Sequence, residues 1–233
     1  MFGNGFNQIA NPDLKPEQSY NVNLRAYTGL LHKGHHLFIE GSAFYRDAKD
    51  FIHSALYLSN AQVSQYQNTS KVKITGVEGE IRYNYLQRLG AFLNGSYQRA
   101  VNNTKYPLGS TSGTPEATYL NKIPNQPWFF GNAGVHYTFH GLLNPHQDLQ
   151  LSWDMQYVHW FYLTWEAYGD LDSKSRIPSQ DIQNIAVSYS LKDGRYSIGA
   201  ECRNFTDALA YDDFRLQKPG TSFSLKLHYF FAK

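Results

Sequence analysis

The sequence predicts an all-β chain, an antiparallel up-and-down meander of about nine long strands. Three observations support this fold class. Apolar and polar residues alternate along almost the whole chain, no stretch of comparable length shows helical spacing, and short connections alternate with long ones. Short turns at one end of a sheet and long loops at the other are typical of a barrel that crosses an outer membrane.

The first predicted strand shows the alternation clearly, because Tyr20, Val22 and Leu24 are interleaved with Asn21 and Asn23. The stretch before it, "NPDLKPE", contains two prolines, which fix φ and cannot donate to a ladder, so we expect a rigid turn into the strand. Eight further strands show the same period of two. The nine predicted strands are Glu17–Gly29, His36–Tyr57, Gln65–Tyr85, Ala91–Val101, Pro127–Phe139, 148–157, 184–191, 196–203 and 223–231.

These strands are long for a water-soluble sheet. A strand and its connection average about 26 residues if nine strands share the 233 residues, whereas turn signals recur about every 8–12 residues in a sandwich. Several strands exceed the roughly 9–11 residues that cross a bilayer at a tilt. Aromatic residues gather near strand ends, as at Tyr83, Tyr85, Tyr137 and Phe139, which is typical of the girdles of membrane barrels. We therefore expect one face to contact lipid and the other an aqueous lumen.

Composition excludes several other classes of protein. The formal net charge of +2 leaves no basic footprint for nucleic acid, and no run reaches the roughly 20 apolar residues of a membrane helix. Cys202 is the one cysteine, which excludes a disulfide framework and a cysteine-based zinc site. The first residues lack the basic and apolar regions of a signal peptide, so we expect a cytoplasmic protein or a piece of a longer chain.

Polar side chains on the second face are the candidates for a lumen wall. Gly76 in "ITGVEGE" is expected to relieve crowding where its strand bends, and the carboxylates after it then point into the lumen. We interpret these polar side chains as lining that forms hydrogen bonds in the lumen, with direct contact to a substrate as the alternative. The predicted lumen-facing residues are Glu78, Glu80, Arg82, Gln150, Asp154, Glu201 and Arg203.

The sequence contains no pattern that would carry catalysis. Its nine histidines include no His-x-x-x-His pair on a helix, and no serine lies in a Gly-x-Ser-x-Gly elbow. We therefore predict that the chain is not an enzyme and holds neither a metal nor a cofactor.

Four segments, taken in order along the chain, carry a family resemblance. "NPDLKPEQSYNVNLR" contains an Asn-Pro-x-Leu-x-Pro-Glu entry, and "YQNTSKVKITGVEGEIRYNY" contains a Tyr-x-Asn…Gly-Val-Glu strand. "NKIPNQPWFFGNAGVHYTF" contains an Ile-Pro-x-x-Pro strand, and "NFTDALAYDDFRLQKPGTSFSLKLHYFF" is similar to a closing hairpin. Together they resemble the TonB-dependent outer-membrane receptors. The departures are Phe205 and Thr206, where Leu and Phe are usual, and Ala232 and Lys233 after the last aromatic residue.

The resemblance implies a place in a larger barrel. Receptors of this family are 22-stranded barrels with an N-terminal plug that carries the energy-coupling box, and nothing in this chain resembles the plug. It implies that residues 17–233 are the C-terminal barrel segment and that residues 1–16 are an extracellular-side loop entering the first strand. The implied function is to bind and import a scarce nutrient, an iron–siderophore type ligand, across the bacterial outer membrane.

The resemblance also implies partners: outer-membrane lipid, a small nutrient ligand, and the inner-membrane TonB system acting through the plug. The long loops would form part of the ligand mouth. Candidate ligand contacts, chosen for position and chemistry, are Tyr106, Tyr119, Trp165, Tyr168, Asp212 and Asp213. Two alternatives stay open, a self-contained structural or adhesive outer-membrane barrel and a soluble β-barrel that binds a small apolar ligand.

Overall fold

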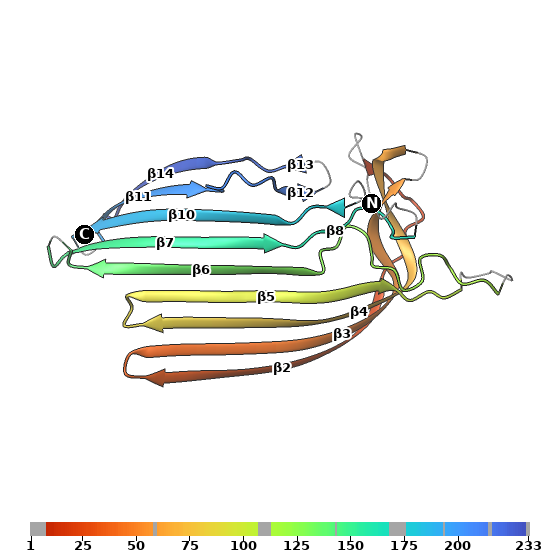
Figure 1. Ribbon diagram of the computed structural model, residues 1–233, viewed down its shortest axis with the longest axis horizontal. Coiled ribbons are helices and arrows are strands. Elements are labelled where there is room, and N and C mark those ends of the chain that lie inside the picture. Colours follow the sequence, from red (N-terminus) through yellow and green to blue (C-terminus); the bar gives the residue numbers. More distant parts are fainter. Residues whose placement is uncertain are drawn as a thin grey trace.

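Nine long strands form one antiparallel sheet in the computed structural model, which describes residues 8–57, 60–106, 113–142, 144–167, 176–192, 194–213 and 216–231 (Figure 1). Each long strand pairs with its neighbours along the chain, which confirms the predicted up-and-down meander. In sheet order the strands are β2 (Gln18–His32), β3 (His35–Tyr57), β4 (Asn60–Tyr85), β5 (Leu89–Asn102), β6 (Phe129–His140), β7 (Gln147–Val158), β10 (Gln180–Leu191), β11 (Tyr196–Arg203) and β14 (Ser222–Tyr229).

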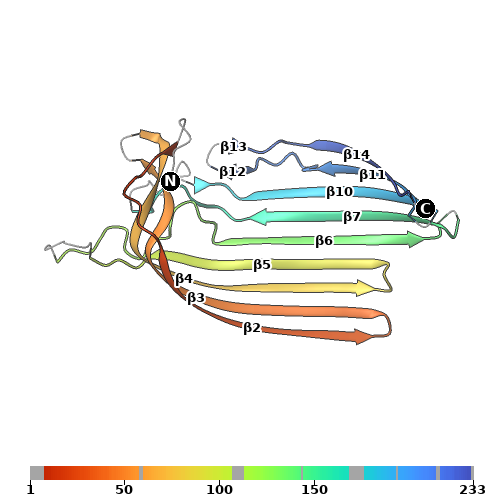
Figure 2. The same ribbon diagram turned by 180° about the vertical axis from the view of Figure 1, so that it is seen from behind.

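Tight turns join strands at one end of the sheet. Only Lys33 and Gly34 separate β2 from β3, and their φ angles are 44° and 83°. Two central residues with positive φ make a type I′ turn, whose twist matches that of the flanking strands. Leu86 and Gln87, between β4 and β5, also have positive φ, 46° and 58°. These turns lie at one end of the sheet and the long connections at the other (Figures 1 and 2).

Five short strands lie outside this meander in the described residues, and the alternation pattern does not predict them. β1 (Gln8–Ile9) pairs in parallel with β4, so part of the predicted entry loop is attached to the sheet. β8 (Phe161–Tyr162) pairs with β9 (Arg176–Ile177), and β12 (Tyr211–Asp213) pairs with β13 (Leu216–Gln217). Segments of two or three residues are too short to show a recognisable period.

The two faces of the sheet differ in chemistry. The register places Leu151, Val187, Ala200 and Leu225 side by side across β7, β10, β11 and β14 on the apolar face. Leu151 is 45% exposed, Val187 39% and Leu225 68%, so no second layer covers them in the part of the chain that the structure describes. The alternate positions form the polar face. A soluble sandwich would bury the apolar set against a second sheet, so this finding argues against that alternative.

The sheet is open in the described residues. Its edge strands, β2 and β14, each pair with one neighbour and do not pair with each other. An unpaired backbone group in hydrocarbon costs several kcal/mol, about as much as burying a peptide group without a partner. The nine strands therefore need further strands beside them to form a stable wall in a membrane, which argues against a self-contained barrel.

Two glycines on the polar face make room for aromatic rings of neighbouring strands. A Cβ added at Gly76 would lie 2.3 Å from the ring of Phe44, and one added at Gly134 would lie 2.4 Å from the ring of Phe92. Rings that cover a glycine in the next strand pack well and help to fix the register. Gly76 therefore provides the space that the Phe44 ring occupies.

A small apolar core lies on the polar face at the long-loop end of the sheet. Trp165, from the connection after β7, packs against it, as does Phe44. Its buried members are Ala48, Phe51, Val72, Ile74, Ala100 and Ile123. The distal part of the β3–β4 hairpin turns away from the common strand direction at this end (Figures 1 and 2). Ile123 and Trp165 come from loops, so these loops cover part of the polar face. This end of the polar face is therefore more apolar than the alternation of residues predicts.

Val187→Arg tests whether the apolar face contacts hydrocarbon. We expect this substitution, in the full-length receptor in lipid vesicles, to lower the free energy of unfolding by about 2–4 kcal/mol, because a guanidinium would lie in the uncharged band. Ser188→Arg, one residue further on the polar face, is the matched control and should have a much smaller effect. Urea titration followed by heat-dependent mobility on gels measures both. An equal loss of unfolding free energy in the two variants would contradict the assignment of the apolar and polar faces.

Candidate functional site

The polar face holds the candidate site. The register aligns Glu40, Glu80, Asn94, Asn132 and Gln156 in one row across β3 to β7, so their side chains share this face. The structure places all seven predicted lumen-facing side chains on the same face. These seven are Glu78, Glu80, Arg82, Gln150, Asp154, Glu201 and Arg203. Six of them belong to two clusters, one on the last four long strands and one on the first four, while Gln150 lies opposite Ser188 outside both.

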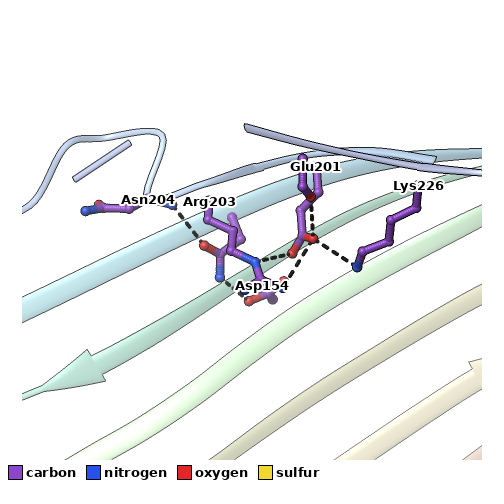
Figure 3. Close-up of polar contacts among 7 residues, drawn as sticks. Asp154, Glu201, Arg203, Asn204 and Lys226 are labelled. Carbon is purple, nitrogen blue, oxygen red and sulfur yellow. Dashed lines mark hydrogen bonds and ion pairs between the residues drawn. The ribbon is translucent and has the colours of Figure 1, made fainter. Parts of the chain in front are cut away.

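Glu201 is the centre of the first cluster (Figure 3). Arg203 donates from Nε to Glu201 Oε1 at 2.7 Å, and Lys226 donates from Nζ to Oε2 at 3.4 Å. Ser224 donates its hydroxyl hydrogen to the same Oε2 at 3.3 Å. The side chains of Arg203 and Lys226 are 61% and 71% exposed, so water screens these pairs and each contributes little to stability.

Asn204 connects this cluster to the loop that follows β11. Its backbone N–H donates to Asn184 Oδ1 at 3.0 Å, and Asn184 Nδ2 donates to Asp154 Oδ2 at 2.7 Å. The Asn204 side chain also exchanges two hydrogen bonds of 2.9 Å with the backbone of Ala208. Asn204 is buried and has a φ of 49°, a conformation that asparagine adopts more readily than most residues.

A polar hollow of about 520 Å³ lies over this cluster. Residues of β7, β10 and β11 form its floor, and the Lys218-Pro219-Gly220 turn before β14 forms one side. Its lining includes two carboxylates and two cations, so its charges balance. The lining residues are Asp154, Gln156, Ile182, Asn184, Glu201, Arg203, Asn204, Lys218, Pro219, Gly220 and Ser222.

The second cluster has more carboxylates than cations. Arg25 donates to Glu40 at 2.6 Å, and Arg82 lies 3.0 Å from a carboxylate oxygen of Glu80. Glu78, between them, accepts hydrogen bonds from the hydroxyls of Ser42 and Ser96, at 3.4 and 3.5 Å. A smaller hollow of about 240 Å³ lies over these residues.

Among the predicted ligand contacts whose side chains the structure describes, no hydrogen bond or ring contact joins one to another. Tyr106 is 49% exposed after β5, and Tyr119 is half-buried in the same loop, where its N–H donates to Glu116. Trp165 packs on the apolar core, with its ring 5.4 Å from that of His53. Tyr168 lies outside the described residues. Asp212 and Asp213 belong to β12, and their side chains also lie outside the description.

A cluster of cations and aromatic rings at the long-loop end was not predicted from the sequence. Lys122 Nζ lies 4.7 Å from the ring centre of Trp128 and 5.7 Å from that of Trp160. The Arg176 guanidinium lies 4.5 Å from the Trp160 ring. Burial is the main cause that lowers the pKa of Lys122, while Glu166 opposes the shift. The tryptophans in "QPWFF" and "VHWFY" were a sequence signal for this cluster, but their cationic partners lie far along the chain.

Within the described residues, no three His, Cys, Asp or Glu side chains gather as they would around a metal ion. The described part of the chain also has no helix of the length and hydropathy needed to span a membrane.

An open antiparallel meander with one apolar and one polar face defines this chain as part of a barrel wall. A sequence model of the family described as "TonB dependent receptor-like, beta-barrel" matches residues 1–205. The chain belongs to this family. A curated relative, heme/hemopexin utilization protein C of Haemophilus influenzae, is 32% identical over 99 residues, which cover 37% of this chain and 13% of the relative.

Solved structures share the fold. The ferric enterobactin receptor PfeA of Pseudomonas aeruginosa matches with a TM-score of 0.60 and 19% identity, over 97% of this chain and 34% of the receptor. The FrpB iron transporter of Neisseria meningitidis matches with a TM-score of 0.59 and 15% identity, over 95% and 33%. The copper transporter OprC matches with a TM-score of 0.64 and 14% identity, over 94% and 32%. The chain thus spans about a third of the length of these receptors.

Asn204→Ala tests the role of the buried asparagine. We expect the substitution to lower the free energy of unfolding by about 1–3 kcal/mol, because the Ala208 backbone loses its partners and alanine resists the left-handed conformation. Phe205→Leu, at the exposed neighbouring position, should remain close to the wild type. Urea unfolding of the full-length receptor measures both variants. A stable Asn204→Ala variant would show that the loop does not depend on this residue.

Proposed function

We propose that this chain is the C-terminal wall of an outer-membrane receptor that binds and imports a scarce nutrient of the iron–siderophore type. Residues 17–233 form the barrel segment, and residues 1–16 enter it from the extracellular side. The observation that carries the proposal is the family match over residues 1–205. The sheet formed by these residues has one face suited to lipid and one suited to water. Members of this family are transporters, and the rest of the wall and the plug come from sequence outside these 233 residues.

The polar face would serve as the inner surface of the transport path. Its ion pairs are exposed and therefore weak individually, so their members can exchange partners at little cost when a plug or a solute passes. The two clusters together hold as many cations as carboxylates, which supports this role because a path with no net charge does not hold an ion tightly. The cations are Arg25, Arg82, Arg203, Lys218 and Lys226, and the carboxylates are Glu40, Glu78, Glu80, Asp154 and Glu201. The inner-membrane TonB system would supply the energy by acting on the plug.

The long loops would contribute to the ligand mouth. Tyr106 is the exposed aromatic residue among the described ligand candidates, and aromatic rings can pack against the planar catechol or porphyrin groups of such ligands. The names of the similar proteins mention ferric enterobactin, iron, copper and heme. They support a metal-containing nutrient, and the siderophore class is the one we propose.

A binding experiment on the full-length receptor that contains this chain tests the proposal. Ferric enterobactin, haem and Cu²⁺ are titrated separately while tryptophan fluorescence is followed. We expect saturable binding of the ferric siderophore with a dissociation constant below about 1 μM. Tyr106→Ala should weaken this binding about tenfold, whereas Lys33→Ala, in the turn at the opposite end, should leave it unchanged.

Growth of a strain that lacks other iron receptors provides the second measurement. We expect the ferric siderophore to support growth only when the inner-membrane TonB system is intact. Saturable binding of haem or Cu²⁺ alone would overturn the siderophore assignment, and growth that does not require TonB would overturn the import mechanism.

A further inference from the structure

Five cations lie on the apolar face at its long-loop end, and we call them the basic band. They come from three strands and one loop that are distant in sequence. The members of the basic band are Lys49 on β3, Lys71 and Lys73 on β4, Arg99 on β5 and Lys122 in the loop after β5.

The register places all five on one face. Lys49 lies directly opposite Lys71, and Lys73 follows two residues further along the same strand. Val101 on β5 pairs with Lys73 on one side and with Lys122 on the other. Arg99 lies two residues before Val101 on the same face. The five side chains therefore form a continuous group at the long-loop end of β3, β4 and β5.

The basic band begins where the aromatic residues of the apolar face end. Lys73 Nζ lies 5.2 Å from the ring centre of Tyr45, and Arg99 follows Tyr97 by two residues on one face of β5. Lys122 lies over the Trp128 ring. Tyrosine and tryptophan rings mark the interface between hydrocarbon and headgroups in membrane barrels. Cations just beyond such rings lie at the level of the lipid headgroups.

The protein does not neutralise this charge. Lys49, Lys71 and Arg99 are exposed, and none of the five cations forms an ion pair within the residues that the structure describes. Asp47 lies opposite Lys73 in the register, and Glu166 favours the charged form of Lys122. These carboxylates lie near the basic band, but no ion pair joins either of them to it in the described residues.

The arrangement is unfavourable unless an anion is present. Like charges directly opposite each other on neighbouring strands are destabilising, as for Lys49 and Lys71. Arg99 also disfavours the charged form of Lys122. A ligand that carries phosphate groups would convert these repulsions into charge-assisted hydrogen bonds.

The short-turn end of the same strands is different. There, in the described residues, the apolar face ends in His35, Tyr83 and Tyr85, and a ring nitrogen of His35 lies 2.7 Å from the Tyr83 hydroxyl. The nearest cations, Lys33 and Arg88, belong to the turns themselves. Cations thus continue along the strand face of β3 to β5 at the long-loop end, whereas in the described residues the short-turn cations lie in or beside the turns, as do Lys192 near Tyr196 and Arg195 near Tyr229.

We propose that the basic band binds the phosphorylated headgroup of a lipid in the outer leaflet. The lysine and arginine side chains would donate hydrogen bonds to the phosphate oxygens, and the acyl chains would lie along the apolar face below Tyr97. A lipid fits better than a soluble anion because the basic band is continuous with the uncovered apolar face. The inference rests on the proposed function for its orientation, since that proposal places the long-loop end outside.

Lipid retention by the purified full-length receptor tests the inference. The band variant carries Lys71→Gln, Lys73→Gln, Arg99→Gln and Lys122→Gln. The matched control carries Lys33→Gln, Arg88→Gln, Lys192→Gln and Arg195→Gln at the opposite end. We expect mass spectrometry to find at least about tenfold less phosphorylated lipid on the band variant than on the wild type or the control. A third variant, with Lys71→Arg, Lys73→Arg and Lys122→Arg, should retain the lipid.

Thermal unfolding of the delipidated receptor provides the second readout. Bis-phosphorylated lipid A should raise the Tm of the wild type, and the rise should diminish as salt is added because salt screens exposed charges. Dephosphorylated lipid A and inorganic phosphate should give much smaller rises. Equal retention by the band variant, or an equal rise with dephosphorylated lipid A, would overturn the proposal.

An equal rise in Tm with inorganic phosphate alone would also overturn the proposed lipid binding, in favour of a soluble anion. Nutrient binding is measured on the same preparations. A receptor that binds no siderophore but retains lipid through the basic band would overturn the proposed function alone, so the two failures can be distinguished.

Discussion

The structure depends on one constraint, which is that backbone N–H and C=O groups inside hydrocarbon must be hydrogen bonded within the protein. The long strands meet it through continuous ladders with their neighbours along the chain. Because a ladder fixes each strand in an extended conformation, successive side chains must point to opposite faces. The polar face is thus a geometric consequence of satisfying the backbone, and function can use it without disturbing the ladders.

This constraint explains why the sheet was readable from sequence. The interleaving of Tyr20, Val22 and Leu24 with asparagines directly reports the faces of β2, since each face has its own solvent. The resemblance at "NFTD" also has a physical basis. Asn204 and Asp207 accept hydrogen bonds from the backbone amides of Ala208 and Thr221, whereas the atypical Phe205 and Thr206 are exposed. These two departures from the family pattern therefore fall where the loop does not need a particular side chain.

The loops were less predictable because their contacts join residues without any period. Trp165 resembles a ligand residue by type and position, yet it packs on a core that includes Val72 and Ile123. The partners of Lys122, including Trp160, follow only from the way two loops fold over the same end of the sheet. The basic band is hidden for the same reason, since only the register brings Lys49 and Lys71 together. Composition, with a net charge of +2, gives no indication of it.

The two faces also differ in how firmly they hold their side chains. On the polar face, the cations around Glu201 are mostly exposed and are screened by water, so they can change partners at little cost. On the other face, most exposed side chains between the two ends of the strands are apolar and offer a solute few hydrogen bonds. The proposed import would need both properties: ladders that resist deformation, and an inner surface whose contacts are weak enough to break repeatedly. Placing the ion pairs on alternate residues of the same strands satisfies both requirements, because breaking a pair at Glu201 leaves the ladder of β11 intact.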